Sequence, residues 1–340
     1  MTESPHAPTP KDIMSRFKPN HPVQQVSAQA THAVRQAAPD STNHHSSEDD
    51  KPAVPIARAP FAEARDAAKG TPGVHAGLLY LRGLPSHDQA TPDDPHPYAE
   101  LVYDVAAVPV PTAYSEAYDR WDRMVITFPS TVVFTATTHS PAAIGLGATS
   151  PIEVGFTLHH TYGVPYLPGS ALKGLARRSA ERFHLSKQEM EILFGDDSET
   201  GSTSAGYITF WDGWLIPTTQ PPLQSDVITV HHPEYYTSGN ALLRSEENTG
   251  KPFTTPITPP TDCDDPNPVP FLSIPQGTSF AVVLTCQAES GEDDRALQWA
   301  QTAATILQYG LTTLGFGAKT NSGYGIFTVE PDLTKELKQL

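Results

Sequence analysis

The chain has 340 residues, enough to bury a full hydrophobic core, and a formal net charge of −16. This acidic excess excludes a protein that coats nucleic acid indiscriminately, because such binding depends on displacing counterions with lysine and arginine. Any nucleic-acid surface must therefore be local. The 34 prolines are about twice the ordinary share and gather in the first hundred residues and between residues 217 and 275, so neither region is expected to form the core.

The two cysteines, Cys263 and Cys286, have neither metal-site spacing nor the pattern of a disulfide framework. We therefore expect a reduced, cytoplasmic protein that holds no metal. The start of the chain lacks the apolar stretch of a signal peptide, and no run of about 18 apolar residues occurs. A soluble protein with no membrane partner is predicted.

Residues 1–72 are rich in Pro, Ala, Ser, His and Gln, which predicts a low-complexity, mostly disordered tail. One folded domain is expected over residues 73–335. The β-branched run from Met124 to Thr138 predicts a long strand, with Pro129 at an edge or bulge. Apolar residues then recur at helical spacing and predict a helix from Ser170 to His184.

The second half of the domain repeats this alternation around a Pro-rich insertion at about residues 213–277. The expected elements are a strand at 205–213, a strand at 278–287, a helix at 293–314, a glycine loop at 315–325 and a strand at 326–329. The order strand, helix, strand, insertion, strand, helix, strand predicts an α+β fold. Its core would be ferredoxin-like or RRM-like, βαββαβ, with the large insertion between strands 2 and 3.

The stretch "LPGSALKGLARR" combines a Pro-Gly turn with a basic helix start. Pro168-Gly169 is expected to end an extended segment, Ser170 is expected to cap the helix, and the free N–H groups and positive dipole end favour phosphate. Lys173 and Arg177 are four residues apart and Arg178 is adjacent, so the cations and the helix end are expected to converge on one anion. The alternative is an ordinary capped helix with solvated basic residues.

The stretch "GFGAKTNSGYG" has four glycines in eleven residues, which allow positive φ angles and close backbone approach to a ligand. Lys319, Asn321 and Tyr324 would supply a charge, hydrogen bonds and a stacking surface for a nucleotide. The alternative is a plain connection from helix to strand. Phe316 stands where a phosphate loop needs its lysine, so neither ATP nor another cofactor is predicted.

Histidines in two adjacent pairs, His159-His160 and His231-His232, raise the possibility of acid–base work, but no catalytic motif accompanies them. For His232 a polar contact inside a folded insertion, an RNA contact and catalysis all stay open. Asp212 could be a nuclease carboxylate, although Asp-Gly after a strand is ordinary turn chemistry.

Together, "YLPGSALKGLAR", "GYITFWDG" and "GFGAKTNSGYG" resemble the RAMP proteins (repeat-associated mysterious proteins) of CRISPR effector complexes. Their hallmarks are a Pro-Gly-Ser-x-x-Lys-Gly helix start and a C-terminal glycine-rich loop. Within that superfamily, "HAGLLYLRGLP", "VITVHHPEYY" and "DDPNPVPFLSIPQGT" look like the sixth-subunit family of the type III-B, or Cmr, module. The resemblance covers roughly residues 75–330.

The resemblance implies a Cas-seven-like backbone subunit in antiviral defence, without catalytic residues, that grips guide RNA toward its 3′ end and stacks on other Cmr-type subunits. Target RNA is a further candidate partner. The residues that it places on RNA are Gly169, Ser170, Lys173, Arg177, Lys319, Asn321 and Tyr324. The insertion, including His232, Tyr235 and Tyr236, would meet RNA or a neighbour. Two alternatives stay open: a metal-independent endoribonuclease that processes guide RNA, and a purely structural subunit.

Overall fold

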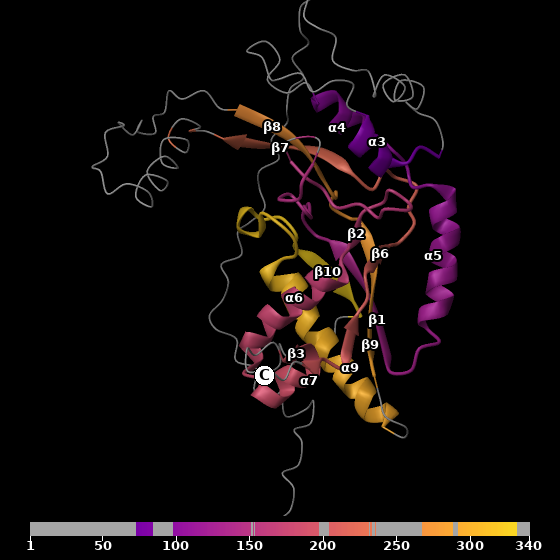
Figure 1. The fold of residues 1–340 in the computed structure, drawn as a ribbon, viewed down its shortest axis with the longest axis vertical. Coiled ribbons are helices and arrows are strands. Elements are labelled where there is room, and N and C mark those ends of the chain that lie inside the picture. Colours follow the sequence, from indigo (N-terminus) through magenta and orange to yellow (C-terminus); the bar gives the residue numbers. More distant parts are fainter. Residues whose placement is uncertain are drawn as a thin grey trace, which may run out of the picture.

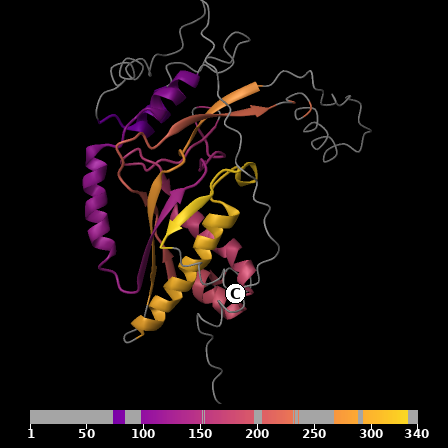
Figure 2. The same ribbon diagram turned by 180° about the vertical axis from the view of Figure 1, so that it is seen from behind.

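The structure is a computed structural model that describes residues 73–83, 98–150, 152, 154–196, 204–230, 232, 235, 267–287 and 292–331. The predicted tail and the centre of the predicted insertion lie outside these residues. Helices and antiparallel strands alternate along the described chain, which makes the fold α+β. Figure 1 shows the arrangement, and Figure 2 shows it from behind.

The main sheet has six strands and is antiparallel throughout. Its order is β10 (Phe327–Glu330), β1 (Thr131–Thr138), β9 (Ser279–Cys286), β6 (Gly213–Leu215) and β2 (Tyr166–Leu167), and β5 (Ile208–Phe210) also pairs with β9. The central strand β9 is therefore bonded to β1 along one edge and to β5 and β6 along the other.

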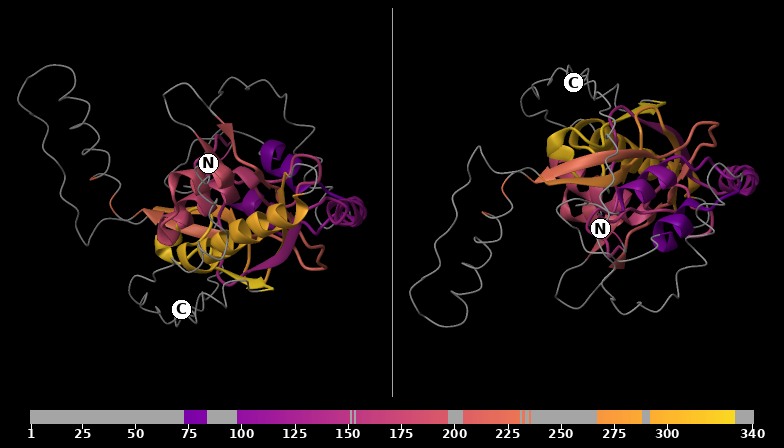
Figure 3. Two further views of the ribbon diagram at one scale, coloured as in Figure 1. Left: turned by 90° about the horizontal axis from the view of Figure 1, so that it is seen from below. Right: turned by 90° about the horizontal axis from the view of Figure 1, so that it is seen from above.

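The two faces of β9 are buried under different helices. Phe280, Val282 and Leu284 belong to the main core, whereas Ala281 and Val283 pack with the side chains of Trp121 and Val125. This alternation follows from the two-residue period of a strand. The main core holds the apolar stripes of α6 (Gly169–Ala180) and α9 (Asp293–Tyr309), and α5 (Thr112–Val125) covers the opposite face (Figure 3).

Both helices predicted for the core are confirmed. Helix α6 continues into a 3₁₀ turn, η1 (Glu181–Phe183), and α9 continues into a π-helical turn, η2 (Gly310–Leu314). The two cross at Gly310, where an added Cβ would meet Ser179 Oγ and lie 2.8 Å from Leu175 Cγ. The absence of a side chain at Gly310 lets the helices approach closely.

The predicted strand from Met124 is wrong at its start. Met124 and Val125 end α5, and β1 begins only at Thr131. The apolar stripe of α5 runs through Tyr114, Trp121 and Val125, but the β-branched residues that follow hide it from the sequence pattern. Three other helices were not predicted: α3 (Ala76–Arg82), α4 (Ala99–Ala106) and α7 (Lys187–Phe194).

The predicted insertion is more regular than expected. Its first residues form β6 in the main sheet, and β7 (Gln224–Val230) pairs with β8 (Asn267–Ser273) over their full length. In Figure 1 this hairpin leaves the body between α3 and α4 above and the yellow loop that follows η2 below. A small ladder joins β3 (Gly195–Asp196) to β4 (Ser204–Ala205) beside α7.

Membrane-spanning character is absent from the helices in the described part of the chain. None of them combines the length and the apolar character needed to cross a bilayer.

Candidate nucleic-acid interface

The start of α6 is capped from a distant segment. Gly169 is the first helical residue, and its N–H donates to Asp212 Oδ1 at 2.6 Å. Pro168 occupies the N-cap position and makes no side-chain hydrogen bond. Ser170 lies exposed in the first turn, so the prediction that it caps the helix is wrong.

Asp212 does more than form a turn, because its side chain caps α6. Its carboxylate lies at the positive end of the α6 dipole, where a negative charge is stabilising. It therefore accepts a hydrogen bond from one of the backbone N–H groups that the sequence analysis expected to bind phosphate. Burial and the charge of Asp212 raise the pKa of Tyr166, the first residue of β2. In the described part of the chain, no group of three His, Cys, Asp or Glu could hold a metal ion.

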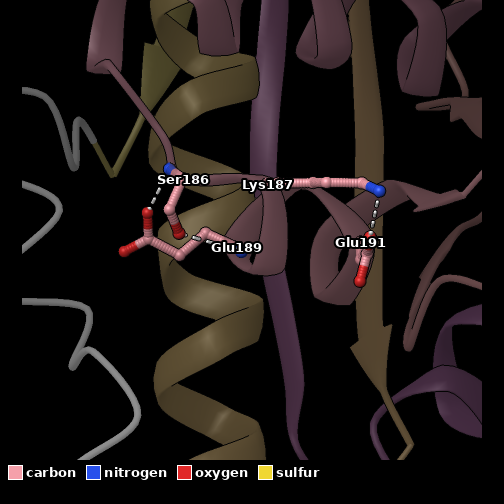
Figure 4. Close-up of polar contacts among 4 residues, drawn as sticks. All are labelled: Ser186, Lys187, Glu189 and Glu191. Atoms are coloured by element: carbon pink, nitrogen blue, oxygen red, sulfur yellow. Dashed lines mark hydrogen bonds and ion pairs between the residues drawn. The ribbon is translucent and has the colours of Figure 1, made fainter. Parts of the chain in front are cut away.

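Helix α7 shows the local alternative to this distant cap (Figure 4). Ser186 Oγ accepts the Glu189 N–H at 3.3 Å, and Glu189 Oε2 accepts the Ser186 N–H at 2.6 Å. This Ser-x-x-Glu capping box is readable from sequence. No acidic residue stands in the first turn of α6, and its cap comes from Asp212, 43 residues further along the chain.

The cations of α6 divide between two sides of the helix. Lys173 and Arg177 are half-buried, whereas Arg178 is exposed. At about 100° per residue, Lys173, Arg177 and Ser170 share one flank, and Arg178 lies a further 100° round the helix. The structure thus brings Lys173 and Arg177 together on a flank of α6 but places Arg178 away from them.

The glycine loop is folded onto protein backbone. Phe316 N–H donates to Gly325 O at 2.8 Å, and Gly325 N–H donates to Pro141 O at 2.8 Å. An added Cβ at Gly317 would overlap the carbonyl oxygen of Ala143, and one at Gly325 would overlap that of Phe316. The close approach that the glycines permit is therefore an approach to the protein itself at these two positions.

The polar residues of the loop have different surroundings. Lys319 has a left-handed backbone (φ 59°), and its Nζ lies 5.9 Å from the ring centroids of both Phe271 and Tyr324. The hydroxyl of Tyr324 donates to Asp226 Oδ2 at 2.6 Å, and burial together with this hydrogen bond raises its pKa. Asn321 is exposed in the 3₁₀ turn η3 (Thr320–Ser322).

Sequence reasoning missed Asp226 and Phe271 as members of this site. Both lie in the β7–β8 hairpin, where they are directly opposite each other in the ladder. The alternation of "SDVITV" and the apolar "VPFL" could have predicted two strands. Nothing in the linear pattern pairs Asp226 with Tyr324, 98 residues away.

The two histidine pairs have different settings. His232 is partly exposed just beyond β7, and Tyr235 is exposed, whereas His231 and Tyr236 lie outside the described residues. His159 is half-buried: its Nδ1 accepts the Thr161 N–H at 3.2 Å, and its ring lies 5.5 Å from that of Trp214. Burial lowers the pKa of His159, and the nearby Asp212 charge offsets part of this effect.

A family model described as the RAMP superfamily matches residues 135–328, which include both glycine motifs. The chain belongs to the RAMP superfamily. Of the curated proteins, the CRISPR system Cmr subunit Cmr6 of Pyrococcus furiosus is 28% identical to this RAMP protein over 242 residues. That match covers 55% of this chain and 65% of the relative, so it spans just under two thirds of the relative's length.

Two solved structures are similar to this RAMP protein. One is a cryo-EM structure of the type III-B Cmr-beta complex bound to cognate target RNA, with a TM-score of 0.49 and 18% identity, covering 79% of this chain and 90% of that chain. The other is the crystal structure of Cmr6 from Pyrococcus furiosus, with a TM-score of 0.32 and 25% identity, covering 58% of this chain and 97% of that chain.

Proposed function

We propose that this protein is a non-catalytic, RNA-binding backbone subunit of a type III-B CRISPR effector complex. It would grip guide RNA toward its 3′ end and pack against other Cmr-type subunits, with target RNA as a further partner. Similarity to Cmr6, which is named as a subunit of a CRISPR system, supports this assignment. Residues 73–335 would form one RAMP domain, and the strand order β10, β1, β9, β5 supports a ferredoxin-like core with an insertion at about 213–277.

The observation that carries the proposal is a pair of lysines in the two glycine motifs. Within the described residues, neither Lys173 nor Lys319 forms an ion pair with a carboxylate. The chain has 38 acidic residues against 22 lysines and arginines, so carboxylate partners are abundant. Lysines without a carboxylate partner in such a chain are suited to binding an external anion. The RNA backbone supplies a series of phosphate anions.

The two motifs are connected through the end of α9. Gly310 packs against Leu175 and Ser179 of α6, and the glycine loop begins at Gly315. The glycine loop therefore follows the α6–α9 contact directly along the chain.

The remaining proposed contacts differ in kind. The exposed Ser170 and Asn321 would donate hydrogen bonds to phosphate or ribose oxygens. Gly169 would act through the shape of the helix start. Arg177 would add charge beside Lys173, and Arg178 would serve a more distant phosphate or a neighbouring subunit. His232 and Tyr235, just beyond β7, would meet RNA or a neighbour.

The proposal is tested by purifying the full chain from cells that express the whole complex. We expect a short guide RNA and several other subunits to copurify. Ultraviolet crosslinking should then join RNA to peptides that contain the start of α6 and the glycine loop, and leave the α7 peptide unlabelled. A particle that contains guide RNA but crosslinks only outside both motifs would contradict the proposed contacts.

A second experiment addresses the absence of catalysis. Repeat RNA incubated with the purified protein should stay intact both with and without divalent metal. Specific cleavage that is lost in His232→Ala would replace the proposal with a guide-processing endoribonuclease.

A further inference from the structure

The β7–β8 hairpin depends on the body of the protein for its position. In the described part of the chain its strands pair with each other and form a separate sheet from the main one. A lone two-stranded hairpin is marginally stable in water. Leu272 anchors the hairpin in the main core, where residues of α4 also pack. Phe271, the next residue back, points to the other face and is fully buried.

The glycine loop covers this second face of the hairpin. The Phe271 and Tyr324 ring centroids are 6.3 Å apart, and the Lys319 ammonium lies 5.9 Å from each. The Tyr324 hydroxyl donates to Asp226 Oδ2 at 2.6 Å, and Asp226 Oδ1 also accepts the Val227 N–H at 2.8 Å. Two donors thus fix the orientation of the carboxylate.

We propose that Asp226, Phe271, Lys319 and Tyr324 form a joint that fixes the hairpin against the glycine loop, and that Asp226 is a positioning residue for RNA binding by that loop. The second half of this inference rests on the proposed function. Charge-assisted hydrogen bonds are about twice as strong as neutral ones, and a cation over two rings adds a further attraction. The joint would make Lys319 and the hairpin move as one body, so that Lys319 is presented to RNA at a defined angle.

The joint itself is tested on the RNA-free full chain by hydrogen exchange of the β8 amides. Asp226→Ala and Tyr324→Phe each remove the same hydrogen bond, so each should speed exchange about tenfold. The double variant should show little further increase, because the two residues act as one pair. Asp226→Asn keeps an acceptor and should restore part of the protection. Thr229→Ala, at an exposed position of the same strand, is the control and should change nothing.

The positioning role is tested with a short single-stranded RNA on the same variants. At a salt concentration that screens the lost carboxylate, Asp226→Ala and Tyr324→Phe should lower affinity by a similar factor, about threefold to tenfold. Tyr324→Phe should leave the salt dependence unchanged because it removes no charge. Asp226→Asn removes the same charge as Asp226→Ala, yet should bind nearly as well as wild type.

Three outcomes would overturn the inference or its second half. Unchanged hydrogen exchange of the β8 amides in both Asp226→Ala and Tyr324→Phe would show that the proposed joint does not hold the hairpin. Faster exchange with unchanged RNA affinity would contradict the positioning role. Affinity lost in Tyr324→Phe alone would also contradict it, because that result indicates a direct contact between Tyr324 and RNA. If the wild type itself binds no RNA, the proposed function and the positioning role fail together, whereas the exchange measurement still decides the joint.

Discussion

The start of α6 and the glycine loop carry similar residues but are built differently. The helix start is stabilised by a single distant carboxylate, Asp212, and its cations lie along a flank of the helix. The loop is closed by backbone hydrogen bonds, and its cation lies over two aromatic rings. In both elements the motif glycines also fall into two groups. Gly169 and Gly325 lie against backbone carbonyl oxygens and fix the shape of the element, whereas Gly174 and Gly323 have open space beside them.

The glycine loop should contain the most destabilising of these substitutions. Gly325 has φ 75°, and a Cβ there would overlap the carbonyl oxygen of Phe316. Gly325→Ala should therefore cost about 3 kcal/mol or more of the free energy of unfolding. Gly323 has φ 87° but open space around it, so Gly323→Ala should cost only about 1 kcal/mol. Urea denaturation measures both, and equal costs would contradict the packing explanation.

The two substitutions in α6 should each have a smaller effect than Gly325→Ala, and their effects should have opposite signs. A Cβ at Gly169 would overlap the carbonyl oxygen of Phe210, so Gly169→Ala should destabilise the fold by about 2 kcal/mol. Gly174 lies in the helix with open space beside it, and Gly174→Ala should gain up to about 1 kcal/mol from helix propensity. Thermal unfolding of the two variants checks this prediction. A loss at both positions would show that Gly174 has an additional role.

Asp212 should oppose RNA at the helix start while it stabilises the helix. Asp212→Asn keeps a hydrogen-bond acceptor for Gly169 but removes the negative charge, so affinity for single-stranded RNA should rise about threefold at low salt and approach the wild-type value as salt screens the charge. Folding should weaken by at most about 1 kcal/mol. Asp119→Asn, at an exposed position of α5, is the control and should leave affinity unchanged. A fall in affinity in Asp212→Asn would instead make the carboxylate essential for the shape of the site.

The smallest effect concerns pH and the half-buried His159. Burial lowers its pKa below the usual 6.5, so below about this pH the unfolded chain binds the proton more readily than the folded chain. Its contribution to stability is therefore present above pH 6.5 and is lost as the pH falls toward the folded-state pKa. His159→Phe should remove this dependence, so that the melting temperature of the wild type falls further than that of the variant between pH 7.5 and acid pH. Identical pH profiles would contradict the assignment, and His139→Gln, at an exposed position, serves as the control.

Regular elements with a clean period were predictable from the sequence. The stripes of α6 and α9 and the apolar run of β9 needed no tertiary information, and the structure confirms them. Helix α5 was missed because its stripe runs into the β-branched residues of β1. The β7–β8 ladder was missed because prolines interrupt β8, although Pro268 and Pro270 fit into a two-stranded ladder.

The site was less predictable than the fold. The sequence singles out Gly169, Lys173 and Lys319 because motif and charge are local properties. The cap by Asp212 and the partnership of Tyr324 with Asp226 join residues 43 and 98 positions apart, so no periodicity reports them. Long-range polar pairs of this kind depend on how the elements pack, which a single sequence does not encode in a readable pattern.

The central claim is that Lys173 and Lys319 contact RNA phosphates. It is tested most directly by the salt dependence of RNA binding to the full chain, with Lys173→Ala and Lys319→Ala beside Lys187→Ala, an exposed lysine paired with Glu191 at 3.6 Å on α7. Each of the first two variants should reduce the slope of log affinity against log salt by about 0.7, as expected for one lost contact to single-stranded RNA. Lys187→Ala should leave the slope at its wild-type value. Equal slopes in all three variants and the wild type would contradict the account.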